Sequence, residues 1–302
     1  MINLHLLRIF FVVAEQRSFS RAAGLLFISQ PAVSKAVREL EHQLGLPLIE
    51  RGVPGSRKSM LLTESGTAMF EHARGIFALE RVALDDVKAR VGLKRGELII
   101  GASTTIAGYW LPEYTARFLA EHPYVRLEVR VKNTHEISEE LIDCNIDLAL
   151  VEGVVNDERI SSTHWRDDEL HIVAKTGSNL SKRRKPGTAE LDAEAWLLRE
   201  TGSGTREFSE RMMAEYGINP QRIIEFGSNE GIVRAVAAGL GVGVVPARTA
   251  RELYMLKEIK AVNYPHSGVL LRPLFLLTLK DRRLSPLAKS FCDMLSKKAA
   301  RS

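Results

Sequence analysis

The N-terminal part of the chain has the hydrophobic pattern of three short helices. Apolar residues at intervals of three and four, from Leu4 to Ala14, give the first helix one buried face. Ser20 precedes a short apolar stretch and is the expected N-cap of a second helix. Ser29 is the expected N-cap of a third helix, which we predict from Gln30 to about Leu44. The pattern therefore predicts a small helical domain with a tight turn before its third helix.

The predicted third helix has one apolar face and one polar face. Its inward positions are Val33, Val37, Leu40 and Leu44. Its outward positions are Gln30, Ser34, Lys35 and Arg38. Gln and Arg can pair with base edges in the major groove of DNA, while Ser, Lys and helix N–H groups can hold phosphates. A DNA-reading helix-turn-helix is one interpretation, and an ordinary helical hairpin with a solvated polar face is the alternative.

A long helix is predicted after Thr63, which is its expected N-cap, with Glu64 in the first turn. Apolar residues recur along it every seven positions, at Phe70, Phe77, Leu84 and Val91. Such a repeat is typical of a coiled-coil seam, so we expect this helix to pair two subunits, although Glu80 interrupts the repeat. The alternative is that the helix packs on the sensing domain of its own chain.

From Glu97 onward, short apolar strands alternate with helices. The first part has predicted strands at 98–101, 127–131 and 147–151 and predicted helices at 110–121 and 136–142. This alternation predicts a parallel, doubly wound α/β sheet. A second such unit has predicted strands at 170–174, 223–226 and 242–245, and the strand 274–279 and the final helix are expected to return to the first unit. We therefore predict two lobes with a cleft between them, about 97–163 with 266–302 and about 164–265.

Ligands in open α/β folds bind beyond the carboxyl ends of strands, against the N-termini of helices. Four such positions carry small or polar residues, and the candidate site comprises Ser103, Thr104, Thr105, Asn133, Thr134, Gly202, Ser203, Thr205, Asn229 and Glu230. Free N–H groups and hydroxyls at helix N-termini favour a carboxylate, phosphate or sulfate. Glu230 argues against a purely anionic ligand, since it could hold an amine or a hydroxyl. Each segment could alternatively be a plain helix cap.

The net charge of +5 lies entirely in residues 1–95, whereas residues 96–302 are neutral overall. A basic module of this kind is an electrostatic footprint for nucleic acid, although a chance excess on a solvated face would give the same number.

No apolar run reaches the length of a membrane span, and the N-terminus lacks the basic region and cleavage site of a signal peptide, so we expect a cytoplasmic protein with no membrane partner. Cys144 and Cys292 belong to no metal-spaced cluster and no enzyme motif is present, so no metal, no cofactor and no enzymatic activity are expected.

The stretch from Ser18 to Arg51, SFSRAAGLLFISQPAVSKAVRELEHQLGLPLIER, resembles the DNA-binding signature of LysR-type transcriptional regulators. The resemblance implies a winged helix-turn-helix in which the DNA-contacting residues include Ser29, Gln30, Pro31, Ser34, Lys35, Arg38 and, at the base of the wing, Arg51. The wing is longer here than is usual in the family, and Arg57 and Lys58 near its tip are expected to reach the DNA backbone; a loop with no contact is the alternative. The family also has a pairing linker helix and an effector domain similar to periplasmic solute-binding proteins.

Segments of the C-terminal part, including RETGSGTREF and GSNEGIVRAVAAGLGVGVVP, are similar to family members that regulate sulfur assimilation and carbon fixation. The sequence thus predicts a winged helix-turn-helix at 1–62, a dimerising linker at 63–91 and an effector-binding domain at 92–302. The expected function is transcription regulation in response to a small anionic metabolite. Expected partners are a pseudo-palindromic DNA site, further copies of the chain and, as a further possibility, RNA polymerase. A solute-binding transport protein is the alternative, and an enzyme is a more distant one.

Overall fold

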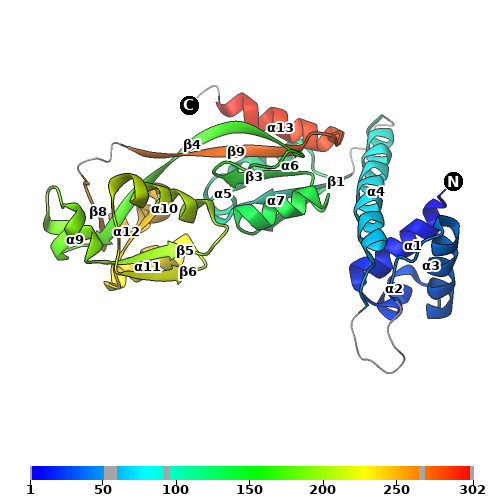
Figure 1. The fold of residues 1–302 in the computed structure, drawn as a ribbon. Helices are drawn as coiled ribbons and strands as arrows, with labels where there is room; N and C mark the ends of the chain where they lie inside the picture. Colours follow the sequence, from blue (N-terminus) through cyan, green and yellow to red (C-terminus); the bar gives the residue numbers. More distant parts are fainter. Residues whose placement is uncertain (1, 51–59, 91–95, 265–268, 300–302) are drawn as a thin grey trace. The chain divides into compact units, whose positions relative to one another are not determined.

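The computed structural model describes residues 2–50, 60–90, 96–264 and 269–299. It divides the chain into two compact units, Met1–Leu84 and Asp85–Ser302. The elements of the two units are drawn in sequence colours in Figure 1. Each unit has its own hydrophobic core, so the two are described separately.

The first unit is helical. Its elements are α1 (Leu4–Gln16), α2 (Phe19–Leu26), α3 (Gln30–Leu44) and most of α4 (Glu64–Arg90). Leu7, Phe10, Val13, Val33 and Leu40 form the centre of its core and are almost completely buried. The inward stripe predicted for the third helix is therefore found in α3.

The caps of these helices follow from local sequence, with one correction. The Ser29 side chain accepts a hydrogen bond from the Ala32 N–H, as expected of the N-cap of α3. The prediction of Ser20 as the N-cap of α2 is wrong, because Ser20 lies inside the helix and the Ser18 Oγ accepts from the Arg21 N–H at 3.3 Å. Starting α2 at Phe19 lets that ring pack against the core, which an N-cap at Ser20 would not.

The segment after α3 is fixed by Glu41 and Thr63. The Glu41 Oε1 accepts hydrogen bonds from the Leu48 N–H at 2.8 Å and the Ile49 N–H at 3.1 Å. An antiparallel bridge joins Ile49 to Leu62 and forms the described base of the wing. Thr63 caps α4, since its Oγ accepts from the Gly66 N–H at 2.9 Å. The wing therefore leaves and rejoins the domain at one place.

The seven-residue repeat of α4 does not form one continuous exposed seam. Phe70 and Phe77 lie against Phe11 of α1, with ring centroids 5.1 Å and 5.5 Å apart. The N-terminal half of the predicted seam thus contacts the chain's own helical domain, where Phe70 and Phe77 are only partly buried. A contact of these two residues with a second subunit stays a prediction. Further along, Leu84 is 54% exposed, whereas Val91 lies outside the described residues. The spacing identified an apolar face correctly, but spacing does not specify which partner covers each part of it.

The second unit is built on a mixed sheet in the strand order β2-β1-β3-β9-β4-β7-β5-β6, with β8 paired to β4. The strands are β1 (Gly96–Ala102), β2 (Val125–Val131), β3 (Leu148–Glu152), β4 (Ile160–Lys175), β5 (Ala195–Arg199), β6 (Arg222–Phe226), β7 (Val242–Pro246), β8 (Ile259–Ala261) and β9 (Leu270–Leu279). The helices are α5 (Thr104–Tyr109), α6 (Leu111–Glu121), α7 (Thr134–Ile142), α8 (Asn179–Lys182), α9 (Thr188–Asp192), α10 (Gly204–Tyr216), α11 (Asn229–Ala238), α12 (Ala247–Met255) and α13 (Pro286–Ala299). The α/β class predicted from the sequence is confirmed.

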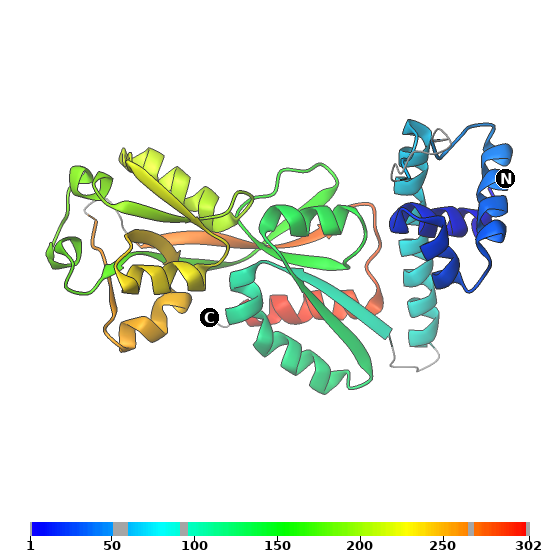
Figure 2. The same ribbon diagram turned by 90° about the horizontal axis from the view of Figure 1, so that it is seen from below.

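Two long antiparallel strands, β4 and β9, run through both lobes of this unit (Figure 2). In the first lobe, β9 pairs with β3, and in the second, β4 pairs with β7 and β8. The final helix α13 packs in the first lobe, where Phe291 and Leu295 are fully buried, and α7 covers the other face of the sheet (Figure 1). The strand and helix at the C-terminus thus return to the first lobe, as predicted.

Three details differ from the elements expected from the sequence. The helix predicted at 110–121 is found as α6, with Pro112 in its first turn, but a short helix that was not predicted, α5, precedes it and ends where the chain turns at Trp110. The strand β5 was not predicted, since its short apolar run has no alternation and is bordered by charged residues. The strand predicted at 170–174 is the second half of β4, which begins at Ile160 and changes register between His164 and Arg166.

Candidate functional sites

The polar face of α3 lies open to solvent in the first unit. Gln30, Pro31, Lys35 and Arg38 are exposed and Ser34 is half-buried. The Gln30 Nε2 donates a hydrogen bond to the Ser34 Oγ at 2.9 Å, which orients the amide along the start of the helix. A groove lined by Gln30, Ser34 and Arg38 runs toward the base of the wing. The predicted contact residues of α3 therefore form one continuous surface, whereas Arg51, Arg57 and Lys58 lie outside the described residues.

The candidate ligand cleft of the second unit lies where α5, α10 and α11 begin. Ser103, Ser203 and Ser228 are the N-caps of these three helices. The Ser103 side chain makes no cap hydrogen bond, and its Oγ is buried without a partner in the described part of the chain. By contrast, the Ser203 Oγ accepts from the Thr205 N–H at 3.3 Å. Of these two hydroxyls, Ser103 has no hydrogen-bond partner at all among the described residues, whereas Ser203 accepts one bond and still has its own proton to donate to a ligand.

Direct hydrogen bonds join the two lobes across this cleft. The buried Arg199, at the end of β5, donates from Nη1 to the Thr104 Oγ1 at 3.0 Å. Asn229, at the start of α11, donates from Nδ2 to the Thr105 Oγ1 at 2.9 Å. The Asn229 Oδ1 is buried and has no partner among the described residues. Thr104 and Thr105, which were expected to face a ligand, thus hold side chains of the second lobe.

A buried ion network lies behind these contacts. Arg272 of β9 is 1% exposed and donates to the Glu152 Oε2 at 2.8 Å and the Asp168 Oδ2 at 2.6 Å. Its Nη1 also donates to the Thr205 Oγ1 at 2.7 Å, and that hydroxyl donates to Glu152. Burial is the main reason that the pKa of the Asp168 carboxyl is raised, while the adjacent Arg272 charge works in the opposite direction. The network connects β3, β4, β9 and α10.

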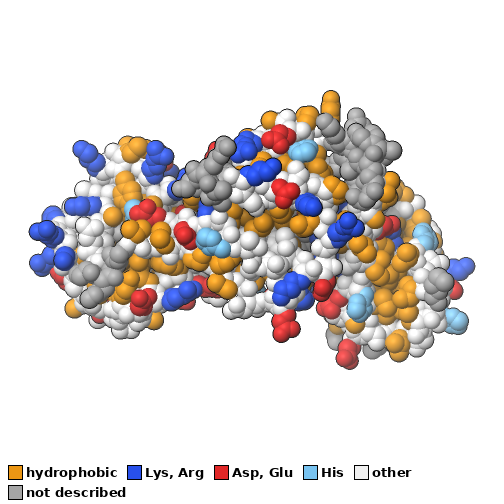
Figure 3. Space-filling view, turned by 90° about the horizontal axis from the view of Figure 1, so that it is seen from above, with side chains coloured by type: hydrophobic (Ala, Val, Ile, Leu, Met, Phe, Trp, Pro, Cys, Tyr) orange, Lys and Arg blue, Asp and Glu red, His pale blue; other side chains and the backbone are white. Residues whose placement is uncertain are grey.

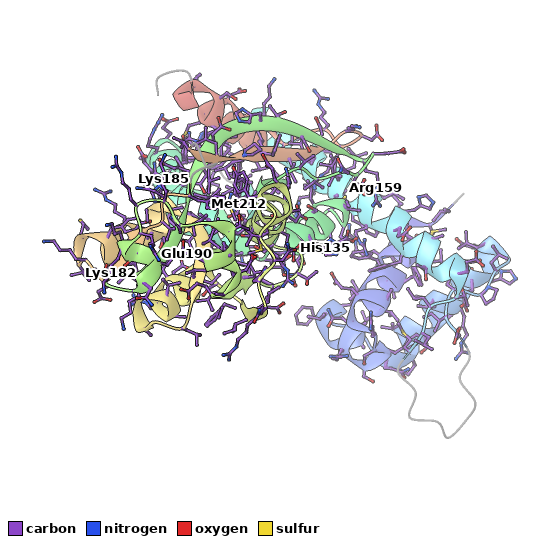
Figure 4. All side chains as sticks on the ribbon, turned by 60° about the vertical axis from the view of Figure 1, so that its left-hand side comes forward. His135, Arg159, Lys182, Lys185, Glu190 and Met212 are labelled. Atoms are coloured by element: carbon purple, nitrogen blue, oxygen red, sulfur yellow. The ribbon has the colours of Figure 1, made fainter. Side chains whose placement is uncertain are left out.

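The remaining predicted residues line the edge of the cleft. Asn133 forms a capping box at the start of α7, and the Thr134 Oγ1 donates to the Glu152 carbonyl at 3.2 Å. His135, labelled in Figure 4, donates its backbone N–H to the Gly202 carbonyl at 3.2 Å. Gly202 has a φ of +88°, a backbone conformation that favours glycine. These contacts bring the loop before α10 against the start of α7.

Two further charges lie next to the cleft. Glu230, at the start of α11, is beside Tyr109, and burial followed by the Glu230 charge raises the pKa of that phenol. Glu200 takes two hydrogen bonds from the Arg199 guanidinium, both 2.7 Å. Burial of the Glu200 carboxyl works to raise its pKa, but the bonds from Arg199 outweigh burial and the pKa is lowered. Arg199 and Arg272 are therefore both neutralised by carboxylates of the protein itself.

Sequence reasoning missed four of the buried charged residues, Glu152, Asp168, Arg199 and Arg272. Each follows or interrupts an apolar strand, as in LALVE for Glu152 and WLLR for Arg199. A charged residue in such a position is rarely buried without a partner, so it is a usable signal for a cleft. The signal does not say which residues pair, because the partners are more than a hundred residues apart in the case of Arg272 and Glu152.

The run from Lys182 to Lys185 lies at the outer end of the second lobe, away from the cleft. All four basic side chains are exposed, and Arg183 forms an ion pair with Glu190 at 2.9 Å. Lys182, Lys185 and Glu190 are labelled in Figure 4. Lys and Arg side chains gather on this end of the surface in Figure 3.

Within the described residues no group of three or more His, Cys, Asp or Glu could hold a metal ion. No helix in this described part of the chain is both long and apolar enough to cross a membrane.

Two family models match the chain and together extend over both units. Residues 4–67 match the bacterial regulatory helix-turn-helix protein of the lysR family, and residues 92–300 match the LysR substrate binding domain. The chain belongs to the LysR family of transcriptional regulators. The family and the combination of a helix-turn-helix with an α/β effector domain, both predicted from the sequence, are thereby confirmed.

LysR-family relatives match over nearly the whole chain. The transcriptional regulator CysL of Bacillus subtilis is 30% identical over 298 residues, with 94% of this chain and 98% of CysL covered. The RuBisCO operon transcriptional regulator of Allochromatium vinosum is 32% identical over 303 residues, with 99% and 97% covered. Both relatives are named as transcriptional regulators.

Solved structures share the LysR-type fold. Full-length CbnR in complex with its target DNA superimposes with a TM-score of 0.66 at 22% identity, and the match covers 98% of this chain and 99% of CbnR. The regulatory domain of Synechocystis CcmR in complex with 2-PG has a TM-score of 0.62 at 24% identity and covers 67% of this chain and 97% of that domain. At these identities the likeness establishes the fold.

Proposed function

We propose that this LysR-family protein is a cytoplasmic transcription regulator that binds a specific DNA site and responds to a small metabolite bound between its two lobes. We assign residues 1–62 to DNA binding, 63–91 to subunit pairing and 92–302 to effector binding. The observation that carries the proposal is that one chain combines an exposed polar α3 with a cluster of polar residues at three helix N-termini where the two lobes meet. The transport alternative explains only the second of these features, and the match to a helix-turn-helix family gives it no support.

For DNA binding, we assign base contacts to Gln30 and Arg38, which project from the first three turns of α3. Ser29, Pro31, Ser34 and Lys35 are assigned to the DNA backbone or to positioning of the helix start. Arg51, Arg57 and Lys58 are assigned to phosphates on the strength of their charge alone. The DNA complex of CbnR supports this use of the domain in a protein of the same fold.

For subunit pairing, we propose the apolar positions of α4 that its own domain leaves exposed. These positions are Ile76, Leu79, Leu84 and Val87, which are 37–61% exposed. They share a broad stripe of the helix, and an exposed stripe of large apolar residues is typical of a protein interface. A paired helix would place two recognition helices on a pseudo-palindromic site. A contact between the regulator and RNA polymerase stays a prediction.

For effector binding, we propose that a carboxylate or phosphate lies at the starts of α5 and α10 and that a hydroxyl or amine faces Glu230. The free Ser103 Oγ and the helix N–H groups supply donors for the anion. Effector binding would replace the direct bond between Arg199 and Thr104 and so change how the lobes meet. The complex of the CcmR regulatory domain with 2-PG supports ligand binding by a domain of the same fold.

The test uses the full chain, its promoter DNA and a metabolite identified by a thermal-shift screen, because a ligand that binds only the folded state raises apparent stability. Thr104→Ala and Ser203→Ala should each weaken effector binding by about tenfold or more, as expected when one hydrogen bond to a charged group is lost. Promoter affinity without effector should be unchanged, since these residues lie in the second unit.

Thr176→Ala is the matched control, because Thr176 is exposed in a turn at the end of β4. It should leave both effector and promoter binding unchanged. If the two cleft variants keep the full effector response, the effector binds elsewhere. If they lose promoter binding as well, these residues are structural caps and the assignment of the cleft is wrong.

A further inference from the structure

An arginine pair, Arg166 and Arg248, meets at one aromatic ring where the two lobes join. Trp110 stands between α5 and α6 in the first lobe, Arg166 lies on β4, and Arg248 is in the first turn of α12 in the second lobe. The Arg248 guanidinium carbon is 3.7 Å from the centre of the Trp110 ring, and that of Arg166 is 4.6 Å from it. Arg166 is also 4.2 Å from the ring of Trp165. Two cations are therefore held close together by aromatic surfaces.

No carboxylate of the described residues is paired with Arg166 or Arg248, although the Arg248 charge does act to lower the pKa of the buried Asp168. In the described part of the chain neither Arg166 nor Arg248 forms an ion pair, and Asp168, the acidic residue that follows Arg166 most closely in the core, is bound to Arg272. Burial, followed by the repulsion from Arg248, lowers the pKa of the Arg166 guanidinium, so the structure leaves this group in an environment that disfavours its charge. Cation–π contacts offset only part of such a cost.

The same cluster contains hydrogen-bond donors that have no acceptor. The Arg166 Nε, the Trp110 Nε1 and the Trp165 Nε1 are buried and unpartnered among the described residues. The Tyr114 hydroxyl accepts from the Arg166 Nη2 and is the acceptor that the cluster does supply. Buried donors without acceptors are costly, and here every unpaired group is a donor. The cluster thus contains two positive charges and three buried N–H donors for which the described residues supply no acceptor.

We propose that Arg166 and Arg248 form a second binding site, separate from the cleft, for a small oxyanion such as phosphate, sulfate or a carboxylate. An oxyanion supplies both missing elements, because its oxygens accept hydrogen bonds and its charge balances two guanidiniums, which bind such groups through paired N–H donors. Arg248 is exposed and gives the anion a route from solvent. Because Trp110 ends the helix that begins at Ser103, an anion here would link α5 to α12 and influence the same lobes as the cleft.

Tryptophan fluorescence of the full chain tests the proposal with inorganic phosphate, sulfate and acetate as probes. Two of the three tryptophans, Trp110 and Trp165, lie at the site, and the third, Trp196, is buried in the core of the second lobe. Each titration is compared with chloride at equal ionic strength. We expect a saturable change with at least one oxyanion and none with chloride; the three probes distinguish a phosphate or sulfate site from a carboxylate site.

Arg166→Gln and Arg248→Gln should each weaken binding by about tenfold or more, the loss expected for a charged hydrogen bond. Arg251→Gln is the matched control, because it removes the same charge from an exposed position one turn along α12. Arg251→Gln should leave the titration unchanged, and so should Thr104→Ala, which separates this site from the cleft. If Arg166→Gln does not fold, Arg248→Gln tests the proposal, because Arg248 is exposed and its replacement should not prevent folding.

Absence of a saturable change in the unmodified protein would overturn the proposal. So would an unchanged affinity in Arg248→Gln, or an equal loss in Arg251→Gln, which would indicate general electrostatics. If Arg248→Gln lowers thermal stability while no oxyanion stabilises the unmodified protein, the cluster is a structural contact between the lobes and the site does not exist.

Discussion

The buried Arg272 offers the sharpest test of how the two lobes are held. Arg272→Met keeps a side chain of similar volume but leaves Glu152 and Asp168, 1% exposed each, without their cation. Removing one partner of a buried ion pair costs about 3–5 kcal/mol, because a charge stays buried and uncompensated. For a urea m-value of about 2–3 kcal/mol/M, the unfolding midpoint should fall by about 1–2 M. All three tryptophans lie in the second unit, so fluorescence of the full chain follows this unit alone.

The loss of stability caused by Arg272→Met should depend on pH in a defined direction. Burial already raises the pKa of Asp168 above its unfolded value, so its carboxyl destabilises the folded state progressively as pH rises from the unfolded toward the folded pKa. Without Arg272, the largest influence that lowers this pKa is gone and the pKa rises further. The variant should therefore lose most stability at neutral and higher pH and recover part of it as the pH falls toward about 5, where buried carboxyls can take up protons.

A double variant provides the control. Asp168→Asn in the Arg272→Met background removes one of the two orphaned carboxylates, so the double variant should be more stable than Arg272→Met alone. The coupling energy between the two sites should lie at about 1–3 kcal/mol. A destabilisation below about 1 kcal/mol that does not vary with pH would refute the reasoning, since an exposed ion pair behaves that way.

Three more outcomes follow from features of single residues. Arg38→Ala should cost about 1–3 kcal/mol of specific promoter binding, and a footprint with unchanged affinity and sequence preference would contradict the assigned base contact. Burial raises the pKa of the Cys292 thiol to about 11, so it should react with iodoacetamide far more slowly at pH 8 than a free thiol, as followed by mass spectrometry; equal rates would contradict its burial. Gly204→Ala should destabilise the second unit by about 1–3 kcal/mol, because its Cβ would lie 2.4 Å from the Glu152 carbonyl oxygen. Gly227→Ala, which meets nothing within 4 Å, should be neutral in the same thermal unfolding assay, and equal losses in both would refute the steric argument.

The sequence was most informative where structure depends on neighbouring residues. Ser29 could be identified as an N-cap because a cap, a following proline and an apolar period all occur within one helix. The error at Ser20 has the same local origin, since Ser18 and Ser20 are equally good caps and only the packing of Phe19 decides between them. Local patterns therefore fixed the elements of the first unit to within about one turn.

Long-range pairing could not be predicted in the same way. The repeat of Phe70 and Phe77 gave an apolar face, but its contact with Phe11 depends on how the chain folds back on itself. In the cleft, the small polar residues were found from their positions after strands. Their hydroxyls turned out to hold Arg199 and Asn229, because a buried charge selects its partners by three-dimensional proximity. The ligand contacts assigned to the cleft stay predictions.

Because of how the chain passes through β4 and β9, most of the second lobe is one continuous insertion in the sequence. The second lobe is inserted between the end of β4 at Lys175 and the start of β9 at Leu270, which are neighbouring strands, whereas the first lobe is assembled from segments on both sides of that insertion. Grafting the corresponding segment of another family member between these two strands would exchange the half of the cleft that carries Ser203 and Asn229. The half formed by α5, and the DNA-binding unit, would keep their own sequence. A regulator could in this way acquire a new signal while still addressing the same promoter.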